Sequence, residues 1–284
     1  MNSHPTASRP LARFAPVVWN QRVSPRILRC GLLLVLIVQM LGAWSPPYVA
    51  AAPSDAVVGD GTPESCDGNA LEAAISSGGM VTFNCGGAHT IVANTMVVDA
   101  GNTVVVDGDG IITISGEGLR QIFIVNASAS LTLNNITLSD GNWPGRGGAL
   151  VVYGQATLNN SAVRDSQSPC WVCDGSDGIG GAIAVEDGGA LTMANSQIVG
   201  NAAASAGGGI ALFGGTAVLA NSRLEGNSTN GVGGALWVNQ GAALTLTESS
   251  VVANAASNAR GGSGGGLLAW GDVTIARSTF SANA

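Results

Sequence analysis

Apolar residues recur two positions apart in short groups through the second half of the chain, and Gly, Asn and Ser separate the groups. A Gly-Gly pair, followed by Ala or Gly and then Leu or Ile, begins at residues 147, 180, 207, 233 and 264, at intervals of 33, 27, 26 and 31 residues. Apolar positions spaced by two predict short strands with one buried face. Because no single copy of such a repeat can bury its apolar residues, the copies must stack on one another.

Alignment of the five copies produces columns of like residues. The first apolar column is Leu150, Ile183, Ile210, Leu236 and Leu267; a serine column is Ser161, Ser196, Ser222, Ser249 and Ser278; and a further column is Ser166, Asn201, Asn227, Asn254 and Asn283. Stacking places the members of a column about 4.8 Å apart, the spacing between paired strands. The sequence therefore predicts an all-β fold, a parallel β-solenoid (β-helix) with three short strands per coil and glycine pairs at its corners. We expect the asparagine amides to form hydrogen bonds along the axis. The serine hydroxyls either do the same or belong to simple turns.

Less regular strands precede the repeats, and a single helix precedes those strands. β-branched segments predict strands at 95–99, 103–107, 111–115, 121–125, 131–133 and 136–138. Asn69 as N-cap, Glu72 three residues later and Gly78 at the end predict a helix over 69–77. A solenoid needs its apolar end covered. We therefore interpret 52–90 as an N-terminal cap with its first strand, and 91–284 as coils.

Residues 1–51 have the composition of a secretory signal peptide. Five arginines precede residue 30, the run 31–42 is mostly apolar, and the small residues Val49, Ala50 and Ala51 stand at the end of the segment. The apolar run is shorter than the about 20 residues that a membrane-spanning helix needs. We expect export to the extracellular space or cell surface, with cleavage near Ala51; an uncleaved N-terminal anchor is the alternative.

The charge of the remaining chain restricts its partners. The sequence has no lysine, and residues 52–284 carry six arginines against 18 carboxylates, a formal charge of −12. Nucleic-acid binding depends largely on basic side chains that neutralise phosphates. We therefore expect no nucleic-acid partner.

The repeat resembles that of bacterial polymorphic outer-membrane proteins, a family of surface β-helix adhesins of the chlamydial type. Phe280-Ser-Ala-Asn283 matches the second half of that repeat in full, whereas the copies with Asn201, Asn227 and Asn254 keep its asparagine alone. Cys66, Leu71-Glu-Ala-Ala-Ile75 and Val81-Thr-Phe-Asn-Cys85 look like the opening of secreted bacterial β-helix proteins. The resemblance covers residues 60–284 and implies a right-handed parallel β-helix at the cell surface or outer membrane. Family members usually carry a C-terminal barrel or anchor, and the fifth copy ends without a capping element, so we expect a part of a longer protein.

Residues 52–284 contain four cysteines, Cys66, Cys85, Cys170 and Cys173. An even number in an exported chain suggests disulfides. Cys66 and Cys85 flank the expected helix and its first strand, so a bridge between them would hold the cap to the coil. Cys170-Trp-Val-Cys173 has the spacing of a redox motif, but it lies in the insertion that lengthens the first interval, and a local loop disulfide is preferred.

The same insertion carries carboxylates that could bind calcium, although it has no regular ligand loop. They are Asp165, Asp174, Asp177, Glu186 and Asp187. We expect no other metal or cofactor. A secreted polysaccharide lyase or glycoside hydrolase is the alternative function, and it would need carboxylates and an arginine in one groove. The arginines fall in different columns of the alignment, which disfavours an enzyme.

One column is aromatic in three of the five coils. Tyr153, Phe213 and Trp270 share a position just after the first strand, and Glu186 and Asn239 occupy it in the other two coils. Trp237 lies two residues away on an outward position. Exposed aromatic residues along such a face bind sugar rings or a protein partner; alternatively the rings shield a turn, and all three would then be little exposed. We expect a non-catalytic adhesion, glycan-binding or display module that uses Tyr153, Phe213, Trp237 and Trp270 to bind a polysaccharide or a cell-surface protein.

Overall fold

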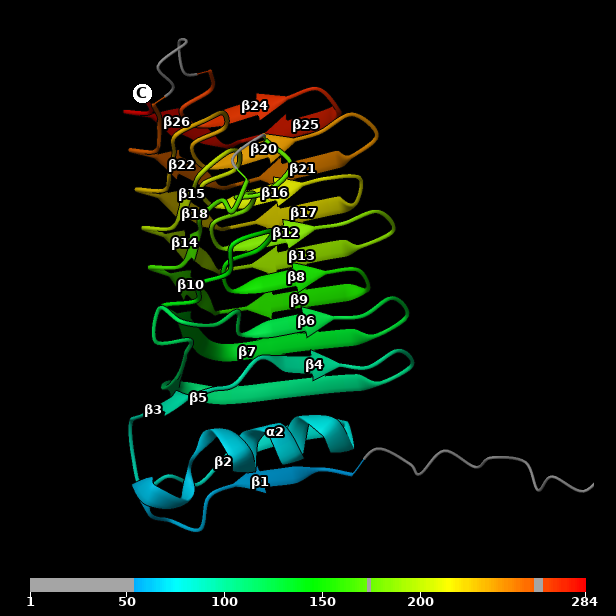
Figure 1. Ribbon diagram of the computed structural model, residues 1–284, viewed down its shortest axis with the longest axis vertical. Coiled ribbons are helices and arrows are strands. Elements are labelled where there is room, and N and C mark those ends of the chain that lie inside the picture. The colour runs from blue at the N-terminus through cyan, green and yellow to red at the C-terminus, as the bar shows by residue number, and fades with distance from the viewer. Residues whose placement is uncertain (1–53, 173–174, 258–262) are drawn as a thin grey trace, which may run out of the picture. The chain divides into compact units, whose positions relative to one another are not determined.

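The computed structural model describes residues 54–172, 175–257 and 263–284, so the predicted signal peptide lies outside the described residues. The described residues form a parallel β-helix, in which short strands of successive coils stack along one axis (Figure 1). The register confirms the sequence alignment, because Ile183 pairs with Leu150 in one neighbouring coil and with Ile210 in the other. The predicted fold class, a parallel β-solenoid, is confirmed.

Three sheets run along the axis. A seven-stranded sheet contains β4 (Met96–Val98), β6 (Phe123–Val125), β8 (Leu150–Val152), β12 (Ile183–Val185), β16 (Ile210–Leu212), β20 (Leu236–Val238) and β24 (Leu267–Ala269). A four-stranded sheet contains β11 (Gln167–Ser168), β15 (Ala202–Ala203), β19 (Ser228–Thr229) and β23 (Ala255–Ala256). The third is a 15-stranded sheet with two wings.

Two long strands join these wings. The first wing contains β9 (Gln155–Asn159), β13 (Ala190–Ala194), β17 (Thr216–Ala220), β21 (Ala243–Thr247) and β25 (Asp272–Ala276). The second wing contains β10 (Ala162–Arg164), β14 (Gln197–Val199), β18 (Arg223–Glu225), β22 (Ser250–Val252) and β26 (Thr279–Ser281). Strands β5 (Thr103–Ser115) and β7 (Ser130–Ser139) extend through both wings, and β1 (Ala56–Val58), β2 (Gly79–Phe83) and β3 (His89–Val92) pair at the N-terminal end.

A coil of the repeat region visits the sheets in a fixed order, for example β12, β13, β14 and β15. Asn195 (φ 51°) turns the chain between β13 and β14, and Gly200 (φ 68°) turns it between β14 and β15. A coil therefore contains four strands, and the predicted number of three is wrong. The fourth strand has two residues, too few to produce an apolar period that the sequence could reveal.

The coils before the repeats contain fewer strands than predicted, whereas the repeat coils contain more. The segments expected at 103–107 and 111–115 are one strand, β5, and those expected at 131–133 and 136–138 are one strand, β7. The bend that the sequence predicts as a strand end lies inside β5, where Asp109 and Gly110 have positive φ and the pairing with β7 shifts register. Such a bend redirects a strand without ending it.

The asparagine column forms the predicted ladder. The backbone N–H and Nδ2 of Asn201 both donate to Oδ1 of Asn227, at 3.1 and 3.0 Å, and Asn227 makes the same two bonds to Asn254. The serine column forms a ladder as well: the N–H of Ser196 donates to Oγ of Ser222 at 3.3 Å. The hydroxyl of Ser196 also donates to the carbonyl oxygen of Ala194 in its own turn at 2.8 Å, so both alternatives for the serines, axial bonding and a turn role, are observed together.

The two positions of a glycine pair require glycine for different physical reasons. Gly180 has a φ of 69°, and a Cβ at this position would collide with the carbonyl oxygen of Ile183. A Cβ on Gly181 would collide with the carbonyl oxygen of Gly208 in the next coil. The first glycine allows the corner and the second allows the coils to stack closely.

Helix α2 (Gly68–Ser77) lies at the N-terminal end of the stack, as predicted, and buries Leu71 and Ile75 against it (Figure 1). The predicted N-cap is wrong. Asp67, in an extended conformation, caps the helix by accepting a hydrogen bond from the N–H of Ala70 at 2.8 Å, and Asn69 already lies in the first turn. A short 3-10 helix, η1 (Pro63–Ser65), precedes this cap.

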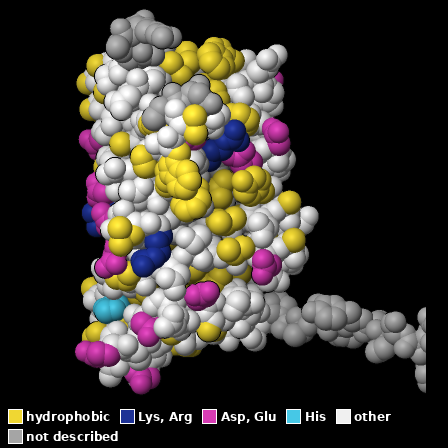
Figure 2. Space-filling model, viewed as in Figure 1, with side chains coloured by type: hydrophobic (Ala, Val, Ile, Leu, Met, Phe, Trp, Pro, Cys, Tyr) yellow, Lys and Arg dark blue, Asp and Glu magenta, His cyan; other side chains and the backbone are white. Residues whose placement is uncertain are grey.

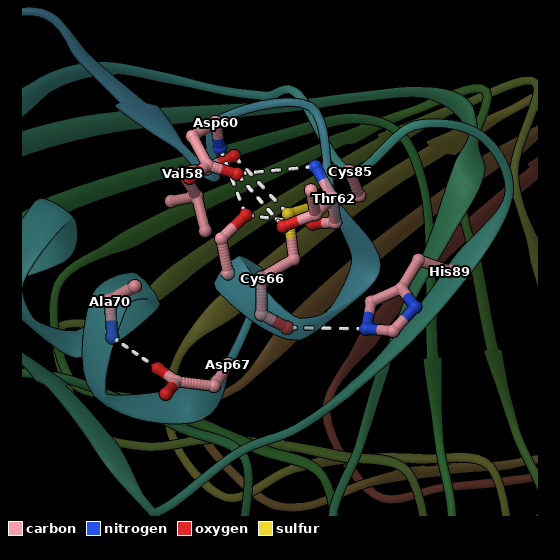
Figure 3. Close-up of a disulfide and its surroundings, with 9 residues drawn as sticks. Val58, Asp60, Thr62, Cys66, Asp67, Ala70, Cys85 and His89 are labelled. Atoms are coloured by element: carbon pink, nitrogen blue, oxygen red, sulfur yellow. Dashed lines mark hydrogen bonds between the residues drawn. A yellow bond between two sulfur atoms is a disulfide. The ribbon is translucent and has the colours of Figure 1, made fainter.

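The disulfide between Cys66 and Cys85 is confirmed (Figure 3). It links the residue before the capping aspartate to the turn just after β2, and both cysteines are buried. His89 faces the same turn, with Nε2 at 3.2 Å from the Cys66 carbonyl oxygen. The bridge thus fixes the entrance of the helix to the first sheet strands. Among the described residues, no helix is long and apolar enough to span a membrane.

Candidate functional site

The outer face of the seven-stranded sheet is covered along its middle. All three residues of β12, β16 and β20 are buried, so the prediction of one buried face is wrong for these strands. A narrow strip of chain connected by isolated parallel bridges runs beside the sheet; it consists of Arg146, Ile179, Ala206, Val232 and Ser263, and we call it the outer strip. Its apolar members pack with the outward residues Ala211 and Trp237 in a small cluster separate from the main core.

The three aromatic residues of the predicted column stand in register at the ends of the strands of this sheet. Their backbone N–H groups donate to the preceding coil, Tyr153 to Val125, Phe213 to Val185 and Trp270 to Val238. The exposed fraction is 43% for Tyr153 and 63% for Trp270, and Phe213 is half-buried. Shielding of a turn required low exposure of all three rings, and that alternative is wrong for Tyr153 and Trp270.

Trp237 connects two of these rings. Its side chain points outward, as the sequence predicted, but only 6% of the residue is exposed. The Trp237 ring lies 5.8 Å from the Phe213 ring, tilted by 56°, and 5.9 Å from the Trp270 ring in an edge-to-face arrangement of 81°. Both geometries are favourable for aromatic pairs. Trp270 is therefore an exposed ring held by a buried one.

Arg146 completes the arrangement from the outer strip. Its guanidinium carbon lies 3.6 Å from the centre of the Phe213 ring, and its Nη1 forms an ion pair with Oε2 of Glu186 at 2.5 Å. One arginine thus bridges the coils of Glu186 and Phe213 through an ion pair and a cation–π contact. We call Tyr153, Phe213, Trp237 and Trp270, together with the Arg146–Glu186 pair, the aromatic face. On the side seen in Figure 2, hydrophobic side chains gather over the middle of the β-helix near an adjacent basic and acidic side chain.

Two buried polar atoms of the aromatic face have no hydrogen-bond partner in the described part of the chain. They are Oε1 of Glu186 and Nε1 of Trp237. Both residues are 6% exposed. Buried polar groups are nearly always paired, so an unpaired acceptor and an unpaired donor under one surface are unusual. They are one acceptor and one donor beneath this surface, which a ligand can reach only when the neighbouring side chains move.

Every arginine that the structure describes is paired with a carboxylate. The pairs are Arg120–Glu117, Arg146–Glu186, Arg164–Asp165, Arg223–Glu225 and Arg277–Glu248. In the exposed Arg223–Glu225 pair, the hydrogen bond between the side chains lowers the pKa of Glu225 and raises the pKa of Arg223. The pairing leaves the described surface without an arginine that is free of a counter-charge.

The insertion after β11 is arranged differently from a metal loop. Oδ2 of Asp177 accepts hydrogen bonds from the N–H groups of Trp171 and Val172, at 2.6 and 2.9 Å. Asp165 pairs with Arg164, and Glu186 with Arg146. Among the described residues, no group of three His, Cys, Asp or Glu side chains could hold a metal ion, and Asp174 lies outside them. Cys170 is disulfide-bonded, whereas Cys173 lies outside the described residues.

Sequence reasoning selected the aromatic residues of the face but missed Arg146. The arginines fall in different columns of the alignment, and Arg146 occupies the position just before the first glycine pair. That position holds Arg146, Ile179, Ala206, Val232 and Ser263. A single cation in a column that is otherwise apolar or small was a usable signal. Glu186 was visible as the only charged member of the aromatic column.

No protein-family model matches the sequence, and no curated protein or solved structure matches it significantly. The fold and the aromatic face therefore carry the functional argument.

Proposed function

We propose that the protein is a non-catalytic binding module of the cell surface or extracellular space, and that it binds a polysaccharide through the aromatic face. The observation that carries this proposal is the exposure of Trp270, 63%, on a ring that buried Trp237 holds in place. An exposed ring that is already ordered loses little conformational entropy when a sugar ring stacks on it. Tyr153 offers a second exposed ring in the same column.

Membership of the polymorphic outer-membrane protein repeat family, and export from the cell, belong to the same proposal. The Gly-Gly rhythm, the parallel β-helix and the Cys66–Cys85 disulfide support it, because disulfides persist in oxidising compartments. The composition of residues 1–51 supports export. A surface location would give the aromatic face access to polysaccharides.

A binding assay with the full chain tests the proposal. The protein is incubated with neutral and acidic polysaccharides, with and without calcium, and both retained protein and new reducing chain ends are measured. Trp270→Ala removes the most exposed ring of the aromatic face. Val218→Ala is the control, because Val218 is 46% exposed but lies on β17 in the first wing of the 15-stranded sheet.

The unchanged protein and Val218→Ala should bind at least one polysaccharide, and Trp270→Ala should bind it about tenfold more weakly or worse, as for a tryptophan that anchors an interface. Equal binding by Trp270→Ala would place the binding site elsewhere. Release of chain ends from any polymer would replace the proposal with the alternative, a polysaccharide-degrading enzyme.

A further inference from the structure

We infer that the ligand of the aromatic face is an uncharged, hydroxyl-rich polysaccharide. The inference rests on the proposed function and adds to it the chemical class of the glycan. Three observations carry it: the pairing of the arginines, the two buried unpaired atoms, and the charge of the chain.

A polyanionic glycan lacks a counter-charge on this surface. Arg146 is the only cation of the aromatic face, and its guanidinium is taken up by Glu186 and by the ring of Phe213. The other arginines that the structure describes are also paired with carboxylates. Residues 52–284 carry a formal charge of −12, which repels a polyanion over the whole surface. An acidic polymer would have to compete with Glu186 for the charge of Arg146.

The two unpaired atoms have opposite requirements. Oε1 of Glu186 needs a hydrogen-bond donor, and Nε1 of Trp237 needs an acceptor. A cationic ligand could supply only the donor that Glu186 Oε1 needs. A carboxylate or sulfate ligand could supply only the acceptor that Trp237 Nε1 needs. A hydroxyl group both donates and accepts, so a ligand with many hydroxyls can satisfy both atoms, directly or through a bridging water, once the side chains that bury them move.

The position of these atoms relative to the rings fits a sugar. Phe213 is their common neighbour, since its ring contacts Trp237 and lies under the arginine that pairs with Glu186. Trp270 lies on the other side of Trp237 and is exposed. A sugar has apolar C–H faces and hydroxyls around its edge, so a polymer of several sugars along this face can stack one ring on Trp270 and present hydroxyls over the preceding coils, which hold Trp237, Phe213 and Glu186.

Matched polymers test the inference. The full chain is assayed against polygalacturonate and its fully methyl-esterified form, which share a backbone and differ in charge, and against neutral glucan, mannan and xylan beside alginate and hyaluronan. We expect binding to at least one neutral polymer, no binding to the polyanions, and less than a twofold change in affinity between low and high salt. Tighter binding to the polyanions would overturn the inference and leave the proposed function standing. No binding to any polymer would overturn both.

A charge variant tests the same inference within the protein. Glu186→Gln keeps the size of the side chain and leaves Arg146 without its counter-charge, so neutral-polymer affinity should fall about tenfold and retention on polygalacturonate should appear at low salt. Glu248→Gln is the matched control, because it changes the net charge equally and releases Arg277 outside the aromatic face. Equal polyanion binding by both variants would show that net charge alone excludes polyanions, and would overturn the role assigned to the aromatic face.

Discussion

Asn201 directs two donors, its backbone N–H and its side-chain Nδ2, at the same oxygen, Oδ1 of Asn227 in the next coil, at 3.1 and 3.0 Å. The Nδ2 of Asn201 also donates to the carbonyl oxygen of Val163 in the preceding coil at 3.1 Å. One buried side chain therefore joins three coils, at a corner where the strands themselves are interrupted. This axial bonding replaces the strand pairing that the corner lacks.

Asn227→Ala should lower the free energy of unfolding by about 3 kcal/mol, because it leaves the buried backbone N–H of Asn201 without its acceptor and removes the bonds of Asn227 to Asn201 Nδ2 and to the carbonyl oxygen of Ile198. Chemical denaturation followed by circular dichroism measures the effect. Asn230→Ala, at an exposed position three residues later, is the control and should change stability by less than about 0.5 kcal/mol. Similar effects of the two variants would show that the ladder contributes little.

Gly181→Ala should be more destabilising than Gly188→Ala, although Gly188 has the more restrictive backbone. Gly188 has a φ of 77°, but a Cβ there meets no atom within 4 Å, so the expected cost is about 1 kcal/mol. A Cβ on Gly181 meets the backbone of the next coil, which cannot move independently, and we expect a cost of about 3 kcal/mol or more. Denaturation midpoints of the two variants decide the order, and the reverse order would contradict close stacking as the reason for the second glycine.

The repeat made most of this fold predictable. Residues that stack must be alike, so the columns led to the register, the glycine corners and the asparagine ladder. The predictions were wrong where a feature produces no periodic pattern. The two-residue strand β15 is one such feature, and the helix cap at Asp67 is another, because Asn69 is an equally good N-cap by its local sequence. Capping depends on where the chain enters the helix, and tertiary contacts decide that point.

The candidate site was predictable only in part. The alignment placed the three rings in one column, and the structure places them at equivalent strand ends. The burial of Trp237 and the contact of Arg146 with Phe213 depend on the outer strip, which folds back over the sheet. Bridges of single residues leave no hydropathy pattern, so the sequence could not show that this outward face is covered.

Removal of the Cys66–Cys85 disulfide should loosen the N-terminal cap before the coils. The bridge closes a segment with a sequence separation of 19 residues, which corresponds to about 3 kcal/mol in the chain-entropy account. We expect the Cys66→Ala/Cys85→Ala double variant to lose amide protection in α2 while the strands from β12 to β22 keep theirs, as hydrogen exchange would show. Substitution is preferable to a reductant, because Cys170 is also disulfide-bonded. Uniform loss of protection would contradict a local role for the bridge.

Asp60 should contribute to stability in a pH-dependent way. Hydrogen bonds from Ser65 and Thr62 lower the pKa of Asp60 below its ordinary value of 3.8. Because the folded pKa is the lower one, the contribution is complete above pH 3.8 and disappears as the pH falls through the folded pKa. Asp60→Asn should remove this part of the acid dependence, and Glu64→Gln, in the same turn, is the control. A titration of the Asp60 carboxyl by NMR at or above 3.8 would contradict the prediction.

Substitution of the two tryptophans of the aromatic face should have different effects, one on stability and the other on polysaccharide binding. Trp237 is 6% exposed between Phe213 and Trp270, so Trp237→Ala leaves a cavity and should lower the free energy of unfolding by about 3 kcal/mol. Trp270 is 63% exposed, so Trp270→Ala should cost less than about 1 kcal/mol while it removes polysaccharide binding. Denaturation and polymer retention, measured on both variants, give the comparison. A large loss of stability in Trp270→Ala would mean that its ring holds the sheet together, and its effect on binding would then be no evidence of contact with the glycan.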